Sequence, residues 1–329
     1  MNEKFSKKER QKMKRILVTG AAGQIGSELT MELRYRYGND SVVAGVNLTQ
    51  PTGKLKESGP FETIDCTDIK QVEHAVKKYS IDCVYHLAAI LSVVAEAKPM
   101  LAWKVNINGL RNVLDVAREN TCAVFTPSSI GVFGPGTPLD NTPQDTIQRP
   151  NTMYGVTKVS GELLCDYYHK RFGIDTRGLR YPGIISCVTL PGGGTTDYAV
   201  EMFYKAIEKK AYTCNLKAGT FLDMMYMPDA IKSAIEVMEA DPVRLKHRNA
   251  FNVTAMSFDP ELLAAEIKKH IPDFALTYEI DAVKQGIADS WPNNMDDSCA
   301  REEWGWSPDY NLPAMVKDML EKLGEKLGK

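Results

Sequence analysis

Several features that would mark a specialised class of protein are missing from this 329-residue sequence. Its seven cysteines include no Cys-x-x-Cys pair, and with only five histidines no zinc-ligand spacing recurs, so we expect no metal site. The most apolar stretch, residues 81–97, is interrupted by Asp82, His86 and Glu96 and is too short to cross a bilayer. Neither an internal repeat nor a low-complexity segment is present.

A strong charge of either sign is also missing. The formal net charge is −2, so nothing suggests binding to nucleic acid or to a membrane surface. The cysteines are scattered, several of them in apolar runs, which favours buried, reduced thiols. Residues 1–13 are charged, include Glu3 and Glu9, and are expected to form a solvated tail rather than a leader. We expect a cytoplasmic protein, or a mitochondrial matrix protein if the chain is eukaryotic.

What the sequence does contain is an alternation of strand-like and helix-like segments. Strands are expected at 15–20, 41–46, 61–64, 83–88, 122–127 and 176–182. Helices are expected at 24–37, 69–79, 100–119 and 153–172. This order predicts an α/β fold with a doubly wound parallel sheet, which binds its ligand at the carboxyl ends of the strands.

The regular alternation fades near residue 185. Helical patterns recur at 197–209, 229–240 and 259–270. We therefore expect a nucleotide-binding domain over 14–185. The segment 186–329 is expected to form mainly a smaller substrate-binding lobe, with some segments returning to the first domain.

A glycine-rich motif follows the first expected strand. Gly20, Gly23 and Gly26 form G-x-x-G-x-x-G and enclose Gln24 and Ile25. Such glycines allow a tight turn close to a pyrophosphate, and the following helix offers free N–H groups and the positive end of its dipole. The position after a strand and before a helix makes this a strong signal for dinucleotide binding.

The second expected strand should place a residue near the adenosine ribose, where an acidic residue is usual. Asn47 stands there, with Val46 as the alternative if the alignment shifts by one residue. The nearby cations Lys54 and Lys56 are expected in a flexible loop. After the third strand, Asp65 and Cys66 are candidates for the adenine contact, with a helix-capping role as the alternative for Asp65 and Asp68 as the better cap.

Tyr154 and Lys158 form Y-x-x-x-K, a spacing that places both side chains on one face of a helix. A free phenol has a pKa of about 10, and a fixed ammonium nearby should lower it, so that the phenolate acts as a base. The same lysine can bind the nicotinamide ribose. Upstream, Ser129 follows the fifth strand and can hold a substrate alcohol against the phenol, with Ser128 as the alternative.

These three motifs together resemble the extended short-chain dehydrogenase/reductases, a group with a Rossmann domain that includes the nucleotide-sugar epimerases. Further segments are similar to the short-chain type of L-threonine 3-dehydrogenases. They are Tyr85–Ser92, Arg180–Ser186, Leu190–Ala199, Met224–Pro228 and Ser290–Pro292. The resemblance covers nearly the whole chain except about the first dozen residues.

The resemblance implies oxidation of L-threonine by NAD to 2-amino-3-oxobutyrate, without a metal. It places Leu87, Ala88, Ala89 and Ile184 along the cofactor. It places Ser92, Thr196, Asp197 and Trp291 near the substrate. For Asp197 a helix N-cap is an equal alternative to an ammonium partner. For Trp291, which could cover the substrate, a position as a simple core aromatic is favoured. Pairing through the helices near 100–119 and 153–172 implies a homodimer.

Two other functions fit parts of the pattern. A nucleotide-sugar epimerase or dehydratase needs a lobe that binds a nucleoside diphosphate, usually through basic residues, but residues 188–200 contain no Lys or Arg. A non-catalytic NAD-sensing protein usually lacks the tyrosine or the lysine, and both are present here.

Overall fold

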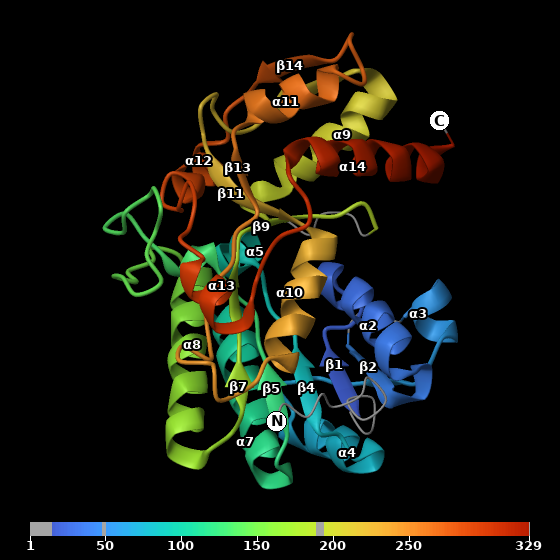
Figure 1. Ribbon diagram of the computed structural model, residues 1–329, viewed down its shortest axis with the longest axis vertical. Helices are drawn as coiled ribbons and strands as arrows, with labels where there is room; N and C mark the ends of the chain where they lie inside the picture. Colours follow the sequence, from blue (N-terminus) through green and yellow to red (C-terminus); the bar gives the residue numbers. More distant parts are fainter. Residues whose placement is uncertain (1–14, 48–50, 189–193, 329) are drawn as a thin grey trace, which may run out of the picture. The chain divides into compact units, whose positions relative to one another are not determined.

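The computed structural model describes residues 15–47, 51–188 and 194–328 (Figure 1). These residues form two compact units. Within the described ranges, the first unit comprises the chain up to Ala89 together with Lys104–Thr126 and Leu163–Arg177. The second unit comprises Ile90–Trp103, Pro127–Glu162 and the chain from Gly178 onward. The expected solvated tail, residues 1–13, lies outside the described residues.

A six-stranded parallel sheet forms the centre of the first unit, in the order β3-β2-β1-β4-β5-β7. Its apolar strands β1, β2 and β4 are buried along their whole length, as expected for a sheet covered on both faces. The strands are β1 Ile16–Thr19, β2 Val42–Val46, β3 Phe61–Thr63, β4 Cys83–His86, β5 Ala123–Phe125 and β7 Thr176–Arg177. The predicted doubly wound α/β fold is therefore confirmed.

Helices of the first unit follow the strands in alternation. They are α2 Gln24–Tyr37, the short helix α3 Gly53–Glu57, α4 Ile69–Tyr79 and α7 Leu110–Asn120, together with the second half of α8 Met153–Phe172. Helices α4 and α7 lie side by side (Figure 1) and bury apolar side chains such as Val72, Val76 and Val113. Lys54 and Lys56, expected in a flexible loop, lie on α3.

The long helix expected over 100–119 is interrupted. The structure has α6 Pro99–Trp103, a π-helical segment Lys104–Gly109 and then α7. A side chain at Gly109 would come within 2.7 Å of the Cys66 Sγ atom, so the chain is tightly packed at this point. Hydrophobic periodicity does not distinguish a π-helical segment from an α-helix, which explains the difference.

The second unit contains three small sheets, most of whose strands the sequence pattern did not reveal. The expected strand 176–182 is split, because β7 belongs to the first unit and β8 to the second. The sheets are β12-β8-β6, β13-β11-β9 and β10-β14. Their strands are β6 Ser128–Ser129, β8 Leu179–Tyr181, β9 Gly183–Ile185, β10 Ala211–Cys214, β11 Leu222–Tyr226, β12 Phe251–Asn252, β13 Met256–Phe258 and β14 Ala275–Tyr278.

Helices α9, α11 and α14 pack together in the second unit (Figure 1) around buried side chains such as Phe203, Leu263 and Met319. Besides α6 and the first half of α8, the helices of this unit are α5 Ser92–Ala97, α9 Tyr198–Lys209, α10 Met227–Glu239, α11 Pro260–Lys268, α12 Ala282–Ala288, α13 Ser298–Trp304 and α14 Leu312–Leu327. Helices α9, α10 and α11 match the three helical patterns of the sequence. None of the helices in the described ranges is long and apolar enough to cross a membrane.

This division differs from the expected boundary at residue 185. Two segments before that residue, Ile90–Trp103 and Pro127–Glu162, belong to the second unit, which takes in the larger share of the chain. The chain therefore passes between the units several times, at points that sequence composition does not mark.

Asp223, in β11, is a fully buried carboxyl group. It accepts hydrogen bonds from Thr254 Oγ1 at 2.5 Å and from the backbone N–H of Met295 at 2.9 Å. Burial raises its pKa to about 8. Since the unfolded-chain pKa is about 3.9, protonation favours the folded state, and this stabilisation is lost as the pH rises through about 8.

We predict that Asp223→Asn weakens the pH dependence of stability. The fall in Tm between about pH 5 and about pH 8 should be smaller in this variant, because the amide carries no charge to desolvate. Thermal unfolding followed by circular dichroism measures it, with the exposed Asp40→Asn as a control. An identical fall in both variants and the wild type would show that Asp223 does not titrate in this range.

Candidate active site

The glycine motif forms the turn between β1 and α2 in the first unit. Gly20 has a positive φ of 73°, and a Cβ atom there would lie 2.8 Å from the backbone nitrogen of Ala88. A Cβ atom at Gly26 would lie 2.2 Å from the Gly20 carbonyl oxygen. Only glycine therefore fits these two positions. Gly23 is the N-cap residue, so no side chain covers the amides at Gln24 and Ile25 where α2 begins.

Three candidate cofactor residues follow β2 and β3. Asn47 is exposed directly after β2, whereas Val46 is buried in the strand, so the structure favours Asn47 over the alternative. Asp65 accepts a hydrogen bond from the backbone N–H of Thr67, but the cap of α4 is Asp68, so the capping alternative for Asp65 is wrong. Cys66 is buried, and its carbonyl accepts a hydrogen bond from Asn112 Nδ2 at 3.0 Å.

Leu87, Ala88 and Ala89 follow β4, the strand beside β1. The N–H of Leu87 donates to the Thr19 carbonyl at 3.0 Å. The first unit thus brings this turn against Gly20. Asn112, which holds Cys66 from α7, was missed from the sequence, because its partner lies far away along the chain.

Ser129, Tyr154 and Lys158 come together in the second unit. Ser129 ends β6, and its Oγ accepts the backbone N–H of Gly131 at 3.1 Å, which leaves the hydroxyl proton to donate to the phenol of Tyr154. Tyr154 is buried near the start of α8, where it packs with Ala95 and Ala102. Lys158 Nζ donates to the Pro127 carbonyl at 2.7 Å and lies 5.5 Å from the Tyr154 ring centroid.

The expected lowering of the phenol pKa is not met. Burial raises the pKa of Tyr154 to about 12, and the hydrogen bond from Ser129 is the contribution that lowers it. The physical reason is desolvation, which penalises the phenolate in a nearly water-free position. The helical spacing correctly placed Lys158 on the same side as Tyr154, but spacing carries no information about burial.

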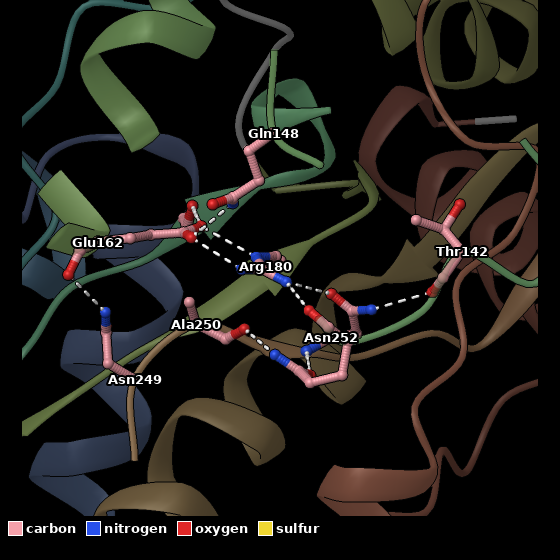
Figure 2. Close-up of polar contacts among 9 residues, drawn as sticks. Thr142, Gln148, Glu162, Arg180, Asn249, Ala250 and Asn252 are labelled. Atoms are coloured by element: carbon pink, nitrogen blue, oxygen red, sulfur yellow. Dashed lines mark hydrogen bonds and ion pairs between the residues drawn. The ribbon is translucent and has the colours of Figure 1, made fainter. Parts of the chain in front are cut away.

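A polar network surrounds Glu162, one helical turn after Lys158 (Figure 2). Its carboxylate accepts hydrogen bonds from Arg180 Nε at 3.0 Å and Nη2 at 2.9 Å, and from Gln148 Nε2 at 2.7 Å. Ser128 Oγ donates to the same carboxylate. Ser128 is therefore engaged with Glu162, whereas its neighbour Ser129 faces Tyr154. Of the two serines that the sequence offered as partners of the phenol, Ser129 is the one beside it.

Sequence reasoning missed Glu162 and Arg180. A signal was present for Glu162, since residues 154, 158 and 162 follow the i, i+4 spacing of one helix face. Arg180 Nη1 also donates to Asn252 Oδ1 at 3.1 Å and to the Gln144 carbonyl at 2.7 Å. Those partners lie in distant segments, and no local pattern points to them.

Two further candidates lie on secondary-structure elements of the second unit. Ser92 is the first residue of α5 and is buried. Ile184 comes after the expected strand 176–182, but it lies within a further strand, β9, and is half-buried. The chain enters β9 from β8, so the expected single strand over 176–182 concealed this arrangement.

Thr196 and Asp197 lie in a 3₁₀ turn, Thr195–Asp197, ahead of α9. A side chain at Gly183 would meet Thr196 Cγ2 at 2.7 Å, so these segments touch. Asp197 is the N-cap residue of α9, but its side chain makes no capping bond to that helix. Its Oδ2 instead accepts the backbone N–H of Gly194 at 2.7 Å, in a capping box at the start of the 3₁₀ turn that leads into α9. The capping alternative is therefore met one turn earlier than expected. Trp291 is buried within the apolar core of the second unit.

One group of potential metal ligands comes together despite the unpromising sequence spacing. His247, Cys299 and Glu303 each offer an atom within 4.8 Å of the others. However, Glu303 Oε2 accepts the backbone N–H groups of Lys246 and His247, and Oε1 is bonded to His247 Nδ1. This carboxylate is already engaged in holding the 246–247 segment on α13, so we assign the group a hydrogen-bonding role.

Comparison with known proteins places this geometry in a family. The family model described as the NAD dependent epimerase/dehydratase family matches residues 16–253. The chain belongs to the NAD-dependent epimerase/dehydratase family. An uncharacterized epimerase/dehydratase from Staphylococcus saprophyticus is 52% identical over 95% of this chain and 98% of its own length.

Solved structures of this family are similar over almost the whole chain. L-threonine dehydrogenase from Clostridium difficile is 57% identical with a TM-score of 0.94, covering 95% of this chain and 98% of that one. The GalE-like L-threonine dehydrogenase from Cupriavidus necator, in its holo form, is 45% identical with a TM-score of 0.91, covering 94% and 99%. UDP-glucose 4-epimerase from Thermotoga maritima shares the fold at 21% identity and a TM-score of 0.82.

Membership of the NAD-dependent epimerase/dehydratase family implies NAD as the cofactor, and the first unit fits it. The turn at Gly20–Gly26 leaves the start of α2 free of side-chain caps, as a pyrophosphate requires. Asn47 and Asp65 stand at the carboxyl ends of β2 and β3, the edge at which such sheets bind nucleotides. These residues would hold the adenosine side of the cofactor.

We predict a modest preference for NADH over NADPH that widens in Asn47→Asp. Asn47 is neutral and does not repel a 2′-phosphate, whereas a carboxylate does. The nearby cations Lys54 and Lys56 are not arginines, whose planar guanidinium binds phosphate in a fixed geometry. The ratio of the two Kd values, measured by fluorescence titration, reports the preference.

Asn39→Asp adds the same charge elsewhere on the first unit and serves as the control. An unchanged ratio in Asn47→Asp would show that this residue does not face the ribose. Tighter binding of NADPH than NADH by the wild type would contradict the preference itself.

Proposed function

We propose that this chain is an L-threonine 3-dehydrogenase that oxidises the 3-hydroxyl of L-threonine to give 2-amino-3-oxobutyrate. The observation that carries the proposal is the grouping of Ser129, Tyr154 and Lys158 in the second unit, where Gly131 lies against both the Ser129 hydroxyl and the Tyr154 ring. The substrate is suggested by solved L-threonine dehydrogenases that are 41–57% identical over at least 94% of the chain.

Proton removal is the step that these side chains perform. Ser129, held by Gly131, donates a hydrogen bond to the phenol and is placed to hold the substrate oxygen as well. Tyr154 as phenolate accepts the hydroxyl proton while the C3–H bond breaks. NAD, when bound, accepts the hydride from C3. Lys158 supplies a positive charge beside the phenol and binds the nicotinamide ribose.

The substrate's charged groups need partners from the second unit. Asp197 supplies a negative charge for the α-ammonium while it also holds the Gly194 backbone. Ser92 and Thr196 supply hydroxyls, and Ile184 offers an apolar surface for the nicotinamide. Trp291 has no substrate role in this proposal, because it is buried in the core.

A nucleotide-sugar epimerase or dehydratase is the competing function, and the names of the curated relatives favour it. It is disfavoured because residues 188–200 contain no basic residue to bind a diphosphate. The UDP-glucose 4-epimerase comparison supports only the fold, at 21% identity.

We predict that the purified protein reduces NAD with L-threonine and does not convert UDP-glucose or UDP-galactose. NADH absorbance follows the first reaction, and chromatography of the sugar nucleotides follows the second. Turnover of a UDP-sugar without threonine-dependent NADH formation would establish the competing function instead.

The NADH absorbance assay, applied to site variants, tests the roles proposed for Tyr154 and Lys158. Tyr154→Phe should lower kcat by about 10²–10⁴-fold and leave the Kd of NAD nearly unchanged, since it removes only the proton acceptor. Because the phenol pKa is about 12, wild-type kcat/KM should rise towards alkaline pH as the phenolate fraction grows. Lys158→Met should move this rise to still higher pH and weaken NAD binding. Wild-type turnover in Tyr154→Phe would remove the tyrosine from the mechanism.

A second copy of this chain is the partner that we infer. Helix α8 exposes Val156, Leu163 and Tyr167, which recur at helical spacing, with exposed fractions of 39%, 61% and 54%. We predict a homodimer in sedimentation velocity that Leu163→Glu converts to monomer, with Leu262→Glu on α11 as the control. One similar structure is a monomeric L-threonine 3-dehydrogenase, which shows that this fold does not require a partner copy. A wild-type protein that sediments as a monomer would therefore contradict the inference.

A further inference from the structure

Glu162 stands at a junction of the second unit where the strand of Ser129 meets the helix of Tyr154. The carboxylate lies on α8, two helical turns after Tyr154 and one after Lys158. Ser128, which precedes Ser129 in β6, donates to it. One side chain therefore links the elements that carry the serine and the tyrosine.

The position of that carboxylate is itself fixed. Arg180 in β8 forms two parallel hydrogen bonds to it, the geometry in which a guanidinium holds a carboxylate most rigidly. Both side chains are nearly buried, with 8% and 6% of their surface exposed. Burial removes competing water, so the pair keeps one arrangement rather than several.

Arg180 is held in turn from the side opposite Glu162 (Figure 2). Asn252 Oδ1 accepts from Arg180, and Asn252 Nδ2 donates to the Thr142 carbonyl at 3.1 Å. Gln144 Nε2 donates to the Ala250 carbonyl at 2.9 Å, and its Oε1 accepts the Asn252 backbone N–H at 2.8 Å. Strands β6, β8 and β12 belong to one sheet, so the network ties that sheet to α8.

We propose that Glu162 is a positioning residue, which fixes the Ser129 hydroxyl against the Tyr154 phenol through Ser128 and Arg180. The assignment rests on the proposed dehydrogenase function for its kinetic consequences. The hydrogen bond from Ser129 favours the phenolate and lowers the pKa of Tyr154, so a displaced serine weakens the base directly. A displacement of about 1 Å in such a site can cost about 10²-fold in rate.

Two variants separate positioning from folding. Glu162→Gln keeps the shape but places an amide against Arg180, and Ser128→Ala removes only the link from Glu162 to β6. Asp175→Asn is the matched control, because Asp175 also forms a two-point pair with an arginine, Arg177, in the first unit. Each variant is assayed well below its own Tm.

The expected results are a fall in kcat of about 10–100-fold in Glu162→Gln and a smaller fall in Ser128→Ala. The Kd of NADH should stay unchanged. The rise of kcat/KM with pH should be shifted to higher pH than in the wild type. With threonine deuterated at C3, the isotope effect on kcat should increase, because impaired chemistry becomes more fully rate-limiting. Asp175→Asn should match the wild type in all of these.

A purely structural role predicts a different outcome. Activity would then fall only in proportion to folded protein, with an unchanged isotope effect and pH profile, and this result would overturn the proposal. Wild-type kcat in a folded Ser128→Ala together with a folded Glu162→Gln would overturn it as well. If the wild type does not oxidise threonine, the proposed function fails first, and the same variants are then compared on the substrate that the wild type does convert.

Discussion

The buried ion pair between Glu162 and Arg180 is the constraint on which the rest of the second unit depends. Removing two charges from water is costly, and the cost is offset only when every remaining donor and acceptor is satisfied. Here Ser128 and Gln148 complete the carboxylate, and Asn252 and the Gln144 carbonyl complete the guanidinium. Losing one partner from such a pair costs about 3–5 kcal/mol, so the segments that supply these groups are held in one arrangement.

The same exclusion of water creates an opposing demand at Tyr154. A buried phenol is a weak acid, with a pKa of about 12 here, and a base must lose its proton before it can act. The protein compensates with groups that favour the phenolate, a donated hydrogen bond from Ser129 and the nearby ammonium of Lys158. Their positions matter more than their number, because hydrogen bonds weaken steeply when their geometry is disturbed.

Local patterns predicted the first unit well, because its elements are decided by their own residues. The apolar runs of β1, β2 and β4 and the periodicity of α2, α4 and α8 lie within single segments. The glycine turn was also predictable, since only glycine fits at Gly20 and Gly26. The π-helical segment Lys104–Gly109 was not, because its hydrophobic spacing does not differ from that of an α-helix.

The candidate site was predictable where its residues share one helix or one turn, and not where folding brings distant segments together. Ser129, Tyr154 and Lys158 were found from spacing, whereas Arg180 lies 18 residues from Glu162 and Asn252 lies 72 residues from Arg180. Asp197 is another example of what local patterns leave open. The sequence suggested that its side chain caps the helix that follows it, whereas the carboxylate accepts the backbone N–H of Gly194, which precedes it.

The path of the chain explains why the reactive side chains gather in the second unit. The chain leaves the first unit after β5, at Thr126, and again after β7, at Arg177, and α8 passes from the second unit into the first after Glu162. Ser128 and Ser129 therefore follow one strand end, Arg180 follows another, and Glu162 is the last residue of α8 in the second unit. Within the second unit, β6 and β8 pair in parallel with Ser128 opposite Arg180, so the serines and the arginine lie side by side in one sheet. The carboxylate of Glu162 is hydrogen-bonded to both Ser128 and Arg180, and it thereby joins α8 to this sheet.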